Sequence, residues 1–217
     1  MPSRAVVFDL DGTLLDTLAD IGDSANEVLR QHEFPEHPDS AYRRFIGDGV
    51  LMLFERALPE AARQPEVIAA CAQGFEESYG RHWKSKTTLY AGIAELLTTL
   101  QQRTLPLTVL SNKPHAFTVK CVAEFLPEWH FDVVFGQRNA VPRKPDPAGA
   151  IEICERLNLA PAECLYLGDS SVDMQTARNA GMLAVGASWG FRDADELRVH
   201  GANFVIDHPR ELLAILS

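Results

Sequence analysis

The sequence predicts an α/β fold, in which helices cover both faces of a mostly parallel sheet and a helical segment is inserted after the first strand. Two observations support this prediction. Short apolar runs with almost no polar alternation recur along the chain, and stretches with helical spacing lie between them. A strand that is buried on both faces has such an uninterrupted apolar pattern, and strands that alternate with helices are typical of a parallel sheet.

Six apolar runs are the predicted strands: residues 5–10, 105–110, 131–135, 164–167, 183–185 and 204–206. Three helical faces lie between them, formed by Ile93, Leu96, Leu97 and Leu100, by Phe117, Cys121, Val122 and Phe125, and by Ile151, Cys154 and Leu157. Ligands of open parallel sheets bind at the carboxyl ends of the strands. Polar residues that directly follow these runs are therefore the candidates for a functional site.

Residues 16–88 break the alternation, because they have helical patterning and no convincing strand. Their two apolar stripes are Ile21, Ala25, Val28 and Leu29, and Leu51, Leu53, Phe54 and Leu58. Several prolines and glycines interrupt the segment. We expect a helical cap domain at 16–88 and a catalytic core formed by 1–15 and 89–217.

Composition limits the classes of function. The chain has 217 residues and a net charge of −10. It has no large Lys/Arg cluster, which argues against a nucleic-acid partner. No apolar stretch approaches the roughly 18 residues of a membrane span, and the N-terminus does not resemble a signal peptide. We expect a cytoplasmic protein whose four scattered cysteines are buried free thiols.

The strongest local signal is the DLDGT stretch at 9–13, directly after the first apolar run. The carboxylates of Asp9 and Asp11 repel one another at this spacing, so their presence at a strand end favours a bound cation. Gly12 permits a sharp turn. An Asp–Gly turn with a Thr cap is the alternative explanation, but a turn does not need two acids.

Two further signals follow along the chain. Ser111, Asn112 and Lys113 come after the second predicted strand, and Pro114 follows them. Alone, this pattern is an ordinary helix start, although a strand end that opens a helix is also an anion site. Lys144 precedes a Pro-rich helix start, where it offers a countercharge to phosphate and carboxylates.

The fourth signal is GDSSVD at 168–173, after the strand that ends at Leu167. Asp169 leaves the strand end, and Asp173 falls in the first turn of the next helix, where an acid is common for reasons of the helix dipole alone. On a parallel sheet, Asp9, Ser111 and Asp169 all meet at one edge. Hard oxygen ligands of this kind suit Mg²⁺.

These four motifs, in this order, resemble those of the haloacid dehalogenase superfamily, and the resemblance covers nearly the whole chain. The closest branch is the phosphoglycolate phosphatases, through stretches at 13–17 (TLLDT), 45–49 (FIGDG), 89–92 (LYAG), 111–114 (SNKP), 180–182 (AGM) and 188–191 (SWGF). The resemblance implies a Rossmann-like core with a helical cap, and a Mg²⁺-dependent phosphomonoester hydrolase that acts on 2-phosphoglycolate or a similar small phosphorylated metabolite.

The resemblance also implies residue roles. Asp9 would be the nucleophile that forms an aspartyl-phosphate, and Asp11 the general acid and base. Ser111, Asn112 and Lys144 would hold the phosphoryl oxygens. Mg²⁺ would be bound by Asp9, by the backbone carbonyl of Asp11 and by Asp169, with Asp173 outside the ligand set, where it orients Lys144 or a metal-bound water.

Substrate contacts are further expected from Thr13, Lys113 and Arg44. Arg43 and Arg44 are candidates for gripping a second anionic group, although a solvated helix face explains them equally well. Three alternatives remain at this point: a pyrophosphatase, a nucleotide or sugar phosphatase on the same scaffold, and a catalytically silent binding protein. A phosphomutase and a dehalogenase fit less well. The sequence is equally compatible with a monomer and a weak homodimer.

Overall fold

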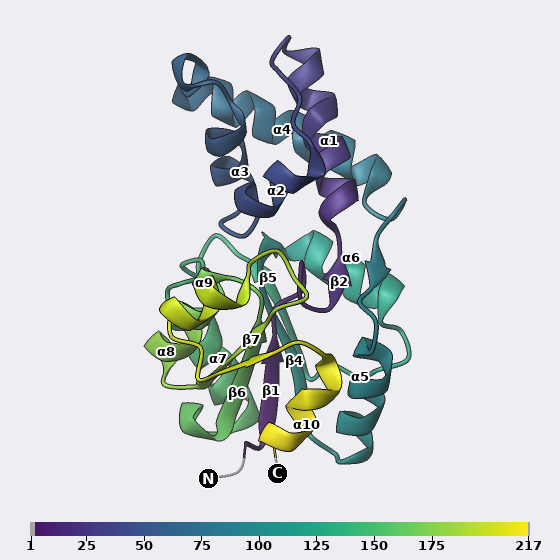
Figure 1. Cartoon of the computed structure of the whole chain (residues 1–217), viewed down its shortest axis with the longest axis vertical. Coiled ribbons are helices and arrows are strands. Elements are labelled where there is room, and N and C mark those ends of the chain that lie inside the picture. Colours follow the sequence, from purple (N-terminus) through teal and green to yellow (C-terminus); the bar gives the residue numbers. More distant parts are fainter. Residues whose placement is uncertain (1–2, 217) are drawn as a thin grey trace. The chain divides into compact units, whose positions relative to one another are not determined.

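The computed structural model describes residues 3–216 of the chain (Figure 1). Its internal contacts divide the chain into two compact units, one formed by Met1–Leu15 with Leu89–Ser217 and the other by Asp16–Thr88. The chain passes between the units twice, and short strands β2 (Leu15–Asp16) and β3 (Thr88–Leu89) pair with one another at these passages.

The first unit is built on a six-stranded sheet in the order β5-β4-β1-β6-β7-β8. Its strands are β1 (Ala5–Phe8), β4 (Leu107–Pro114), β5 (Val133–Gln137), β6 (Cys164–Gly168), β7 (Leu183–Ala187) and β8 (Phe204–Ile206). Every neighbouring pair is parallel. All six runs predicted as strands are strands, and the Rossmann-like parallel sheet that the sequence predicts is confirmed.

Helices follow these strands as the crossovers of a parallel sheet require. They are α5 (Ile93–Gln102), α6 (His115–Phe125), α7 (Ala148–Leu157), α8 (Ser171–Ala180), α9 (Ala194–Val199) and α10 (Leu212–Ile215), with 3₁₀ turns η2 (Pro161–Glu163) and η3 (Pro209–Glu211). Helix α8 packs on β6 and β7 and against α7 and α9, whereas α5 packs against η3. Right-handed crossovers place α7, α8 and α9 on one face of the sheet and α5 and α6 on the other.

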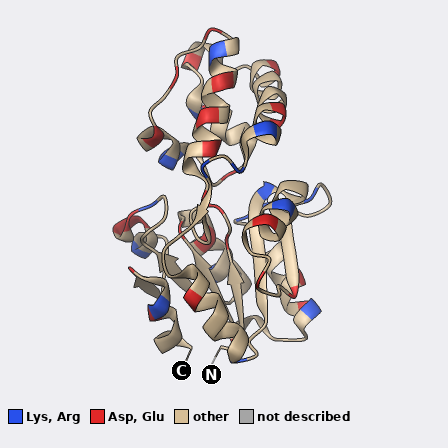
Figure 2. Ribbon diagram, turned by 90° about the vertical axis from the view of Figure 1, so that its right-hand side faces the viewer, with Lys and Arg blue, Asp and Glu red and all other residues tan. Residues whose placement is uncertain are grey.

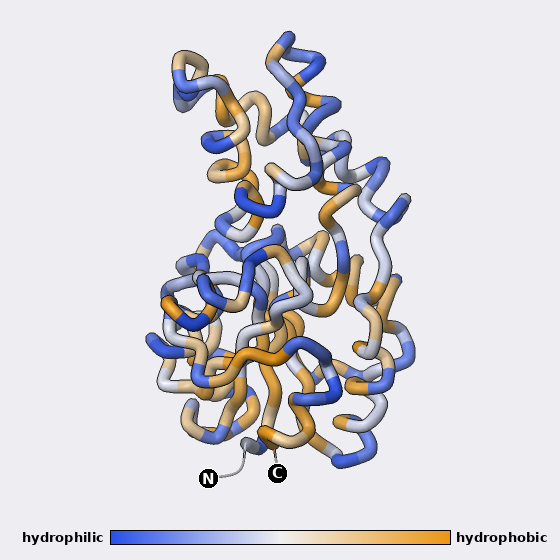
Figure 3. The backbone as a smooth tube through the Cα atoms, viewed as in Figure 1, coloured by the Kyte–Doolittle hydropathy of each residue, from blue (hydrophilic) through white to orange (hydrophobic). Residues whose placement is uncertain are grey.

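The core of this unit lies between the sheet and its helices. Strand β1 is buried along its whole length, and so is β6, because each has a strand on both sides and helices over both faces. Figure 3 shows the hydrophobic residues concentrated along these central strands. Helix α7 differs from the predicted face: Ala150, Ile153 and Cys154 are buried, whereas Ile151 is 38% exposed.

Strand β4 also differs from the prediction. The sequence predicts its end at Leu110, but the strand continues to Pro114, with an irregular register against β5 between Leu110 and Pro114. The helix start expected at 111–112 therefore begins at His115, and its N-cap, Pro114, makes no side-chain capping bond. Residues 111–113 lie on an irregular strand extension and are all buried.

The second unit consists of α1 (Leu18–Gln31), α2 (Asp39–Phe45), α3 (Val50–Ala57), the 3₁₀ turn η1 (Glu60–Ala62) and α4 (Pro65–His82). Helix α1 packs against α2 and α4, and α3 packs against α2 and α4. The predicted stripe on α1 is fully buried, whereas Leu51 of the second stripe is 46% exposed. Figure 2 shows acidic and basic residues mixed along the helices of each unit.

The four cysteines are buried free thiols, as the sequence predicts. None of the helices within residues 3–216 combines the length and the apolar character needed to cross a bilayer.

Candidate active site

The candidate site forms where the neighbouring strands β1 and β6 end, at the edge of the sheet where β4 becomes irregular. Phe8, the last residue of β1, is level with Val109 of β4 and Leu167 of β6. The backbone N–H of Asp9 donates to Leu167 O at 2.9 Å, so Asp9 continues the alignment by one residue. Asp169 follows directly after β6. The parallel register therefore brings the first and fourth sequence motifs to the same edge of the sheet.

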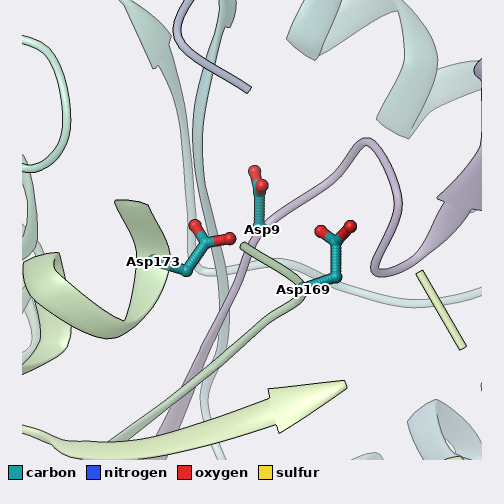
Figure 4. A group of neighbouring side chains, drawn as sticks. All are labelled: Asp9, Asp169 and Asp173. Carbon is teal, nitrogen blue, oxygen red and sulfur yellow. The ribbon is translucent and has the colours of Figure 1, made fainter. Parts of the chain in front are cut away.

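Three carboxyl groups converge at this edge (Figure 4). One carboxylate oxygen each from Asp9, Asp169 and Asp173 lies within 4.8 Å of the others. All three residues are buried. Like charges at this separation in a buried place are costly unless a cation or a proton compensates for them.

The electrostatics of Asp9 reflect this crowding. Burial, followed by the nearby Asp173 carboxylate, raises the pKa of Asp9 to about 7, although Lys144 acts in the opposite direction. Burial, followed by the Asp173 and Asp9 carboxylates, also raises the pKa of Asp169 well above its usual range. The positive charge of the protein therefore does not fully compensate for these two carboxyls, and a bound cation would favour their ionised forms.

Lys144 supplies one ammonium to this cluster. Its Nζ lies 3.1 Å from Asp9 Oδ1 and 2.6 Å from Asp173 Oδ1. Nζ also donates to Leu110 O at 3.1 Å and to the Tyr166 hydroxyl at 3.0 Å. Burial opposes the charge, but Asp173 and Asp9 raise the pKa of Lys144 well above its usual range. Lys144 is thus a permanent cation held next to Asp9.

Asn112 fixes the backbone that carries Lys144. Its Oδ1 accepts from Lys144 N at 2.9 Å, and its Nδ2 donates to Lys144 O at 3.2 Å. This reciprocal pair anchors the 143–146 loop to β4, so Lys144 enters the site from a fixed backbone. The neighbouring Ser111 is 4% exposed, and its Oγ accepts from Lys113 N at 3.2 Å.

Asp169 is held from two sides. Its Oδ1 accepts from Thr13 Oγ1 at 3.0 Å, and its Oδ2 accepts from the backbone N–H of Phe191 at 2.7 Å. Gly12 has a φ of +86°, and a Cβ at this position would lie 2.2 Å from Asp169 Oδ2. Glycine is therefore required in the 9–13 motif by conformation and by the close approach of Asp169.

Asp173 has a different environment, although it belongs to the same cluster. It is residue N3 of α8, and its Oδ2 accepts from Ser170 N at 3.0 Å and Ser170 Oγ at 2.6 Å, as in a capping box. Its Oδ1 accepts from Lys144 Nζ and lies 3.3 Å from the Tyr166 hydroxyl. Both oxygens of Asp173 thus have protein donors, and the side chain links the helix start to Lys144.

Asp11 and Lys113 form a pair of their own. Lys113 Nζ lies 2.9 Å from Asp11 Oδ1 and 3.2 Å from Asp11 Oδ2. The Lys113 side chain is only 5% exposed, and the Asp11 side chain only 12%. An ammonium that reaches both oxygens of a carboxylate restricts its orientation. Lys113, which the sequence suggests as a substrate contact, therefore contacts Asp11 in this structure.

The remaining predicted substrate residues lie in two places. Thr13 is fully buried and points to Asp169. Arg44 lies in the last turn of α2, in the second unit, where both Arg43 and Arg44 are exposed.

One residue that contacts Lys144 belongs to none of the four sequence motifs. Tyr166 lies within β6 and reads there as an ordinary apolar strand residue. Its hydroxyl accepts from Lys144 Nζ and donates to Leu110 O at 3.0 Å, while burial raises its pKa well above the usual value. A signal for it is present in the sequence, because Tyr166 is a tyrosine in a run that is predicted to be buried on both faces. Its hydroxyl needs a buried hydrogen-bond partner there.

The donor set fits a hard divalent cation. Three carboxylates contribute up to three negative charges, and Lys144 is the cation that contacts two of them. Each Asp169 oxygen accepts one protein hydrogen bond and retains a further lone pair. Carboxylate oxygens with water and phosphate oxygens are the ligands that Mg²⁺ prefers.

Comparisons with known proteins identify a family for the chain. The family model described as haloacid dehalogenase-like hydrolase matches residues 6–187. A phosphoglycolate phosphatase from Psychrobacter arcticus is 33% identical over 206 residues, which cover 91% of this chain and 89% of that protein. One from Nitrosospira multiformis is 32% identical, covering 91% and 88%.

Solved structures are similar over the same extent. A crystal structure of a candidate phosphoglycolate phosphatase from Lactobacillus delbrueckii subsp. bulgaricus superposes with a TM-score of 0.94 at 32% identity, covering all of both chains. A predicted phosphoglycolate phosphatase from Haemophilus somnus gives a TM-score of 0.91 at 26% identity, with 99% of this chain and 98% of that chain covered.

Proposed function

This chain belongs to the haloacid dehalogenase-like hydrolases, and we propose that it is a phosphomonoester hydrolase that works through an aspartyl-phosphate on Asp9. One observation carries the proposal: the Asp9 carboxyl is buried at the end of β1, 3.1 Å from the Lys144 ammonium and beside the Asp169 and Asp173 carboxyls. A carboxylate and a phosphate can approach one another only where fixed positive charge compensates for both.

In the first step, a carboxylate oxygen of Asp9 attacks phosphorus and forms the aspartyl-phosphate bond. The bond from phosphorus to the leaving oxygen breaks, and its electron pair remains on that oxygen. A proton from the Asp11 carboxyl neutralises the leaving alkoxide. Lys144, with the Ser111 hydroxyl and the Asn112 backbone, stabilises the charge on the phosphoryl oxygens.

In the second step, Asp11, now a carboxylate, takes a proton from the water that attacks phosphorus. The aspartyl-phosphate bond breaks, its electrons return to Asp9, and inorganic phosphate leaves. Asp11 is then protonated again for the next cycle. The contact between Asp11 and Lys113 restricts the orientation of the carboxyl that this proposal uses in both steps.

The cofactor in this proposal is Mg²⁺, held by Asp9, Asp169 and the backbone carbonyl of Asp11. When bound, it supplies Lewis-acid charge that offsets the repulsion between the nucleophile and the phosphate. Asp173 is placed outside the ligand set in this proposal, since its Oδ1 is paired with the Lys144 ammonium and its Oδ2 accepts two hydrogen bonds from Ser170. By contrast, within the described part of the chain neither oxygen of Asp169 contacts a cation of the protein, and each accepts one hydrogen bond.

The substrate in this proposal is a small phosphorylated metabolite, and 2-phosphoglycolate is the first choice because the relatives reported above bear that name. Thr13, Lys113 and Arg44 remain the proposed substrate contacts. The proposal places the enzyme in the cytoplasm as a monomer or weak homodimer, without a nucleic-acid or membrane partner.

The test is phosphate release with and without Mg²⁺ from 2-phosphoglycolate, other small phosphomonoesters, sugar phosphates, nucleotides and pyrophosphate. Asp9→Asn should abolish turnover while the protein stays folded, and the matched control Asp195→Asn should keep it, because Asp195 is exposed on α9. Phosphate covalently attached to Asp9 should be detectable by mass spectrometry after rapid quenching.

Other outcomes select the alternatives. A preference for pyrophosphate, nucleotides or sugar phosphates would keep the mechanism and change the substrate. Near-normal turnover by Asp9→Asn would refute the nucleophile. The absence of any Mg²⁺-dependent turnover would favour a catalytically silent binding protein.

A further inference from the structure

The loop at 188–191 (SWGF) follows β7 and has no part in the chemistry described above, although its sequence resembles that of the phosphoglycolate phosphatase branch. The structure brings this loop against Asp169. The backbone N–H of Phe191 donates to Asp169 Oδ2 at 2.7 Å. A Cβ at Gly190 would lie 2.3 Å from Asp169 Cβ and 2.4 Å from Gly12 O.

Gly190 therefore has a steric role. Its backbone lies against both the Asp169 side chain and the Gly12 carbonyl, so a side chain at this position would push these groups away. The loop thus limits the orientation of the Asp169 carboxyl through Oδ2, whereas Thr13 contacts Oδ1.

Trp189 joins this loop to the nucleophile motif. Its indole Nε1–H donates to Thr13 O at 3.0 Å, and Thr13 Oγ1 in turn donates to Asp169 Oδ1 at 3.0 Å. The contacts close a ring from Asp169 through Phe191 and Trp189 to Thr13 and back to Asp169. This ring contacts both oxygens of the Asp169 carboxyl. It joins Thr13 to Trp189, which are 176 positions apart in the sequence.

We propose that the 188–191 loop is a part of the cation site and that Trp189 is a positioning residue, which holds Thr13 and Phe191 so that Asp169 points toward the cation. The inference rests on the proposed function, because it requires a divalent cation at Asp169. Groups that orient a metal ligand without touching the metal typically change metal affinity about 10- to 100-fold. Trp189 itself is assigned no contact with substrate or cation.

The first experiment measures Mg²⁺ affinity by calorimetry on the full chain without substrate. Trp189→Phe removes the indole donor and keeps an aromatic ring, and should weaken Mg²⁺ binding about 10-fold. The matched control is Trp129→Phe, since the Trp129 indole N–H also donates one 3.0 Å bond, to Thr98 Oγ1 in the same unit. The control should bind Mg²⁺ within about 2-fold of the unmodified chain, because Trp129 lies outside the ring of contacts.

A second measurement keeps Trp189 in place. The double variant Trp83→Phe, Trp129→Phe leaves Trp189 as the only tryptophan, and its fluorescence should change as Mg²⁺ is added, with the midpoint at the calorimetric affinity. This variant decides the question if Trp189→Phe does not fold.

Several outcomes would overturn the inference. Equal Mg²⁺ affinity of Trp189→Phe and Trp129→Phe would show that the loop does not orient Asp169. Mg²⁺-insensitive Trp189 fluorescence in a protein that binds Mg²⁺ would do the same, with the proposed function unaffected. If the unmodified chain binds no Mg²⁺ at all, the cation of the proposed function fails, and this inference fails with it.

Discussion

The Tyr166 hydroxyl lies 3.0 Å from Lys144 Nζ and 3.0 Å from Leu110 O, inside a strand that is buried on both faces. It accepts from the ammonium and donates to the carbonyl. Lys144 also contacts Asp9 and Asp173, so Tyr166 is one of the groups that determine where the ammonium points. The hydroxyl therefore acts on the proposed nucleophile through Lys144.

Tyr166→Phe should lower kcat about 10-fold and leave KM nearly unchanged, because the ammonium loses an orienting acceptor and the substrate loses no contact. The variant loses the hydrogen bonds of the hydroxyl with Lys144 Nζ and with Leu110 O, so the free energy of unfolding should fall by about 2 kcal/mol. Tyr42→Phe is the control: its hydroxyl donates to Asn26 Oδ1 within the helical unit, so stability should fall while kcat stays the same. Steady-state kinetics and thermal unfolding of both variants test this, and an unchanged kcat for Tyr166→Phe would contradict it.

Lys113→Met should separate two roles of the Asp11–Lys113 contact. If Lys113 orients Asp11, kcat/KM should fall about 10-fold for both 2-phosphoglycolate and ethyl phosphate, whose alkoxide leaving groups need a proton. It should fall much less for p-nitrophenyl phosphate, whose leaving group is weakly basic. A loss confined to 2-phosphoglycolate would instead indicate that Lys113 grips the substrate carboxylate. Lys120→Met, an exposed lysine on α6, is the control and should change none of the three values.

Asp169→Asn and Asp173→Asn should differ, although the two carboxyls lie in one cluster. Asp169→Asn removes a proposed ligand, so Mg²⁺ should no longer raise the Tm of the protein. Bound Mg²⁺ at 100 times its Kd stabilises a folded protein by about 2.7 kcal/mol. Asp173→Asn should keep most of this stabilisation and lose kcat instead, since Asp173 contacts Lys144. Equal loss of the Mg²⁺-induced Tm shift in both variants would place Asp173 among the ligands.

The raised pKa of Asp9 makes the stability of the metal-free protein depend on pH. The pKa is 3.8 for an ordinary aspartate and about 7 in the folded chain, so the folded state binds more protons than the unfolded state between these values. The stabilisation is complete below pH 3.8 and is lost progressively as the pH rises to about 7, by an amount on the order of 4 kcal/mol.

Denaturant unfolding of the metal-free protein from pH 5 to pH 8 checks this sign. The decline in the free energy of unfolding should be shallower for Asp9→Asn, which cannot ionise at that position. Saturating Mg²⁺ should reduce the decline in the unmodified protein, because the cation favours the ionised carboxyl. A decline equally steep in Asp9→Asn would assign the effect to other groups.

Most of the sheet could be predicted from the sequence, because a strand buried on both faces has no alternative to an apolar run. The exceptions have local causes. The sequence predicts the end of β4 too early because residues 111–113 are polar, yet they belong to the strand, where Asn112 contacts the Lys144 backbone. The sequence places Ile151 on the buried face of its helix, whereas α7 buries Ile153 instead. Helical spacing alone does not choose between apolar residues that lie so close together in the sequence.

The sequence by itself determined that acids, a hydroxyl and a lysine follow successive strands, and parallel strand order is enough to bring such residues to one edge of the sheet. Only the tertiary structure decided their partners. It directs Thr13 to Asp169 across 156 positions and Trp189 to Thr13 across 176, gives both oxygens of Asp173 protein donors, and pairs Lys113 with Asp11. The physical reason is the distance along the chain over which each effect acts. The spacing of apolar residues and the residue preferences of turns depend on a few neighbouring residues. A hydrogen bond in a buried site depends instead on which distant segment of the chain the sheet places beside it.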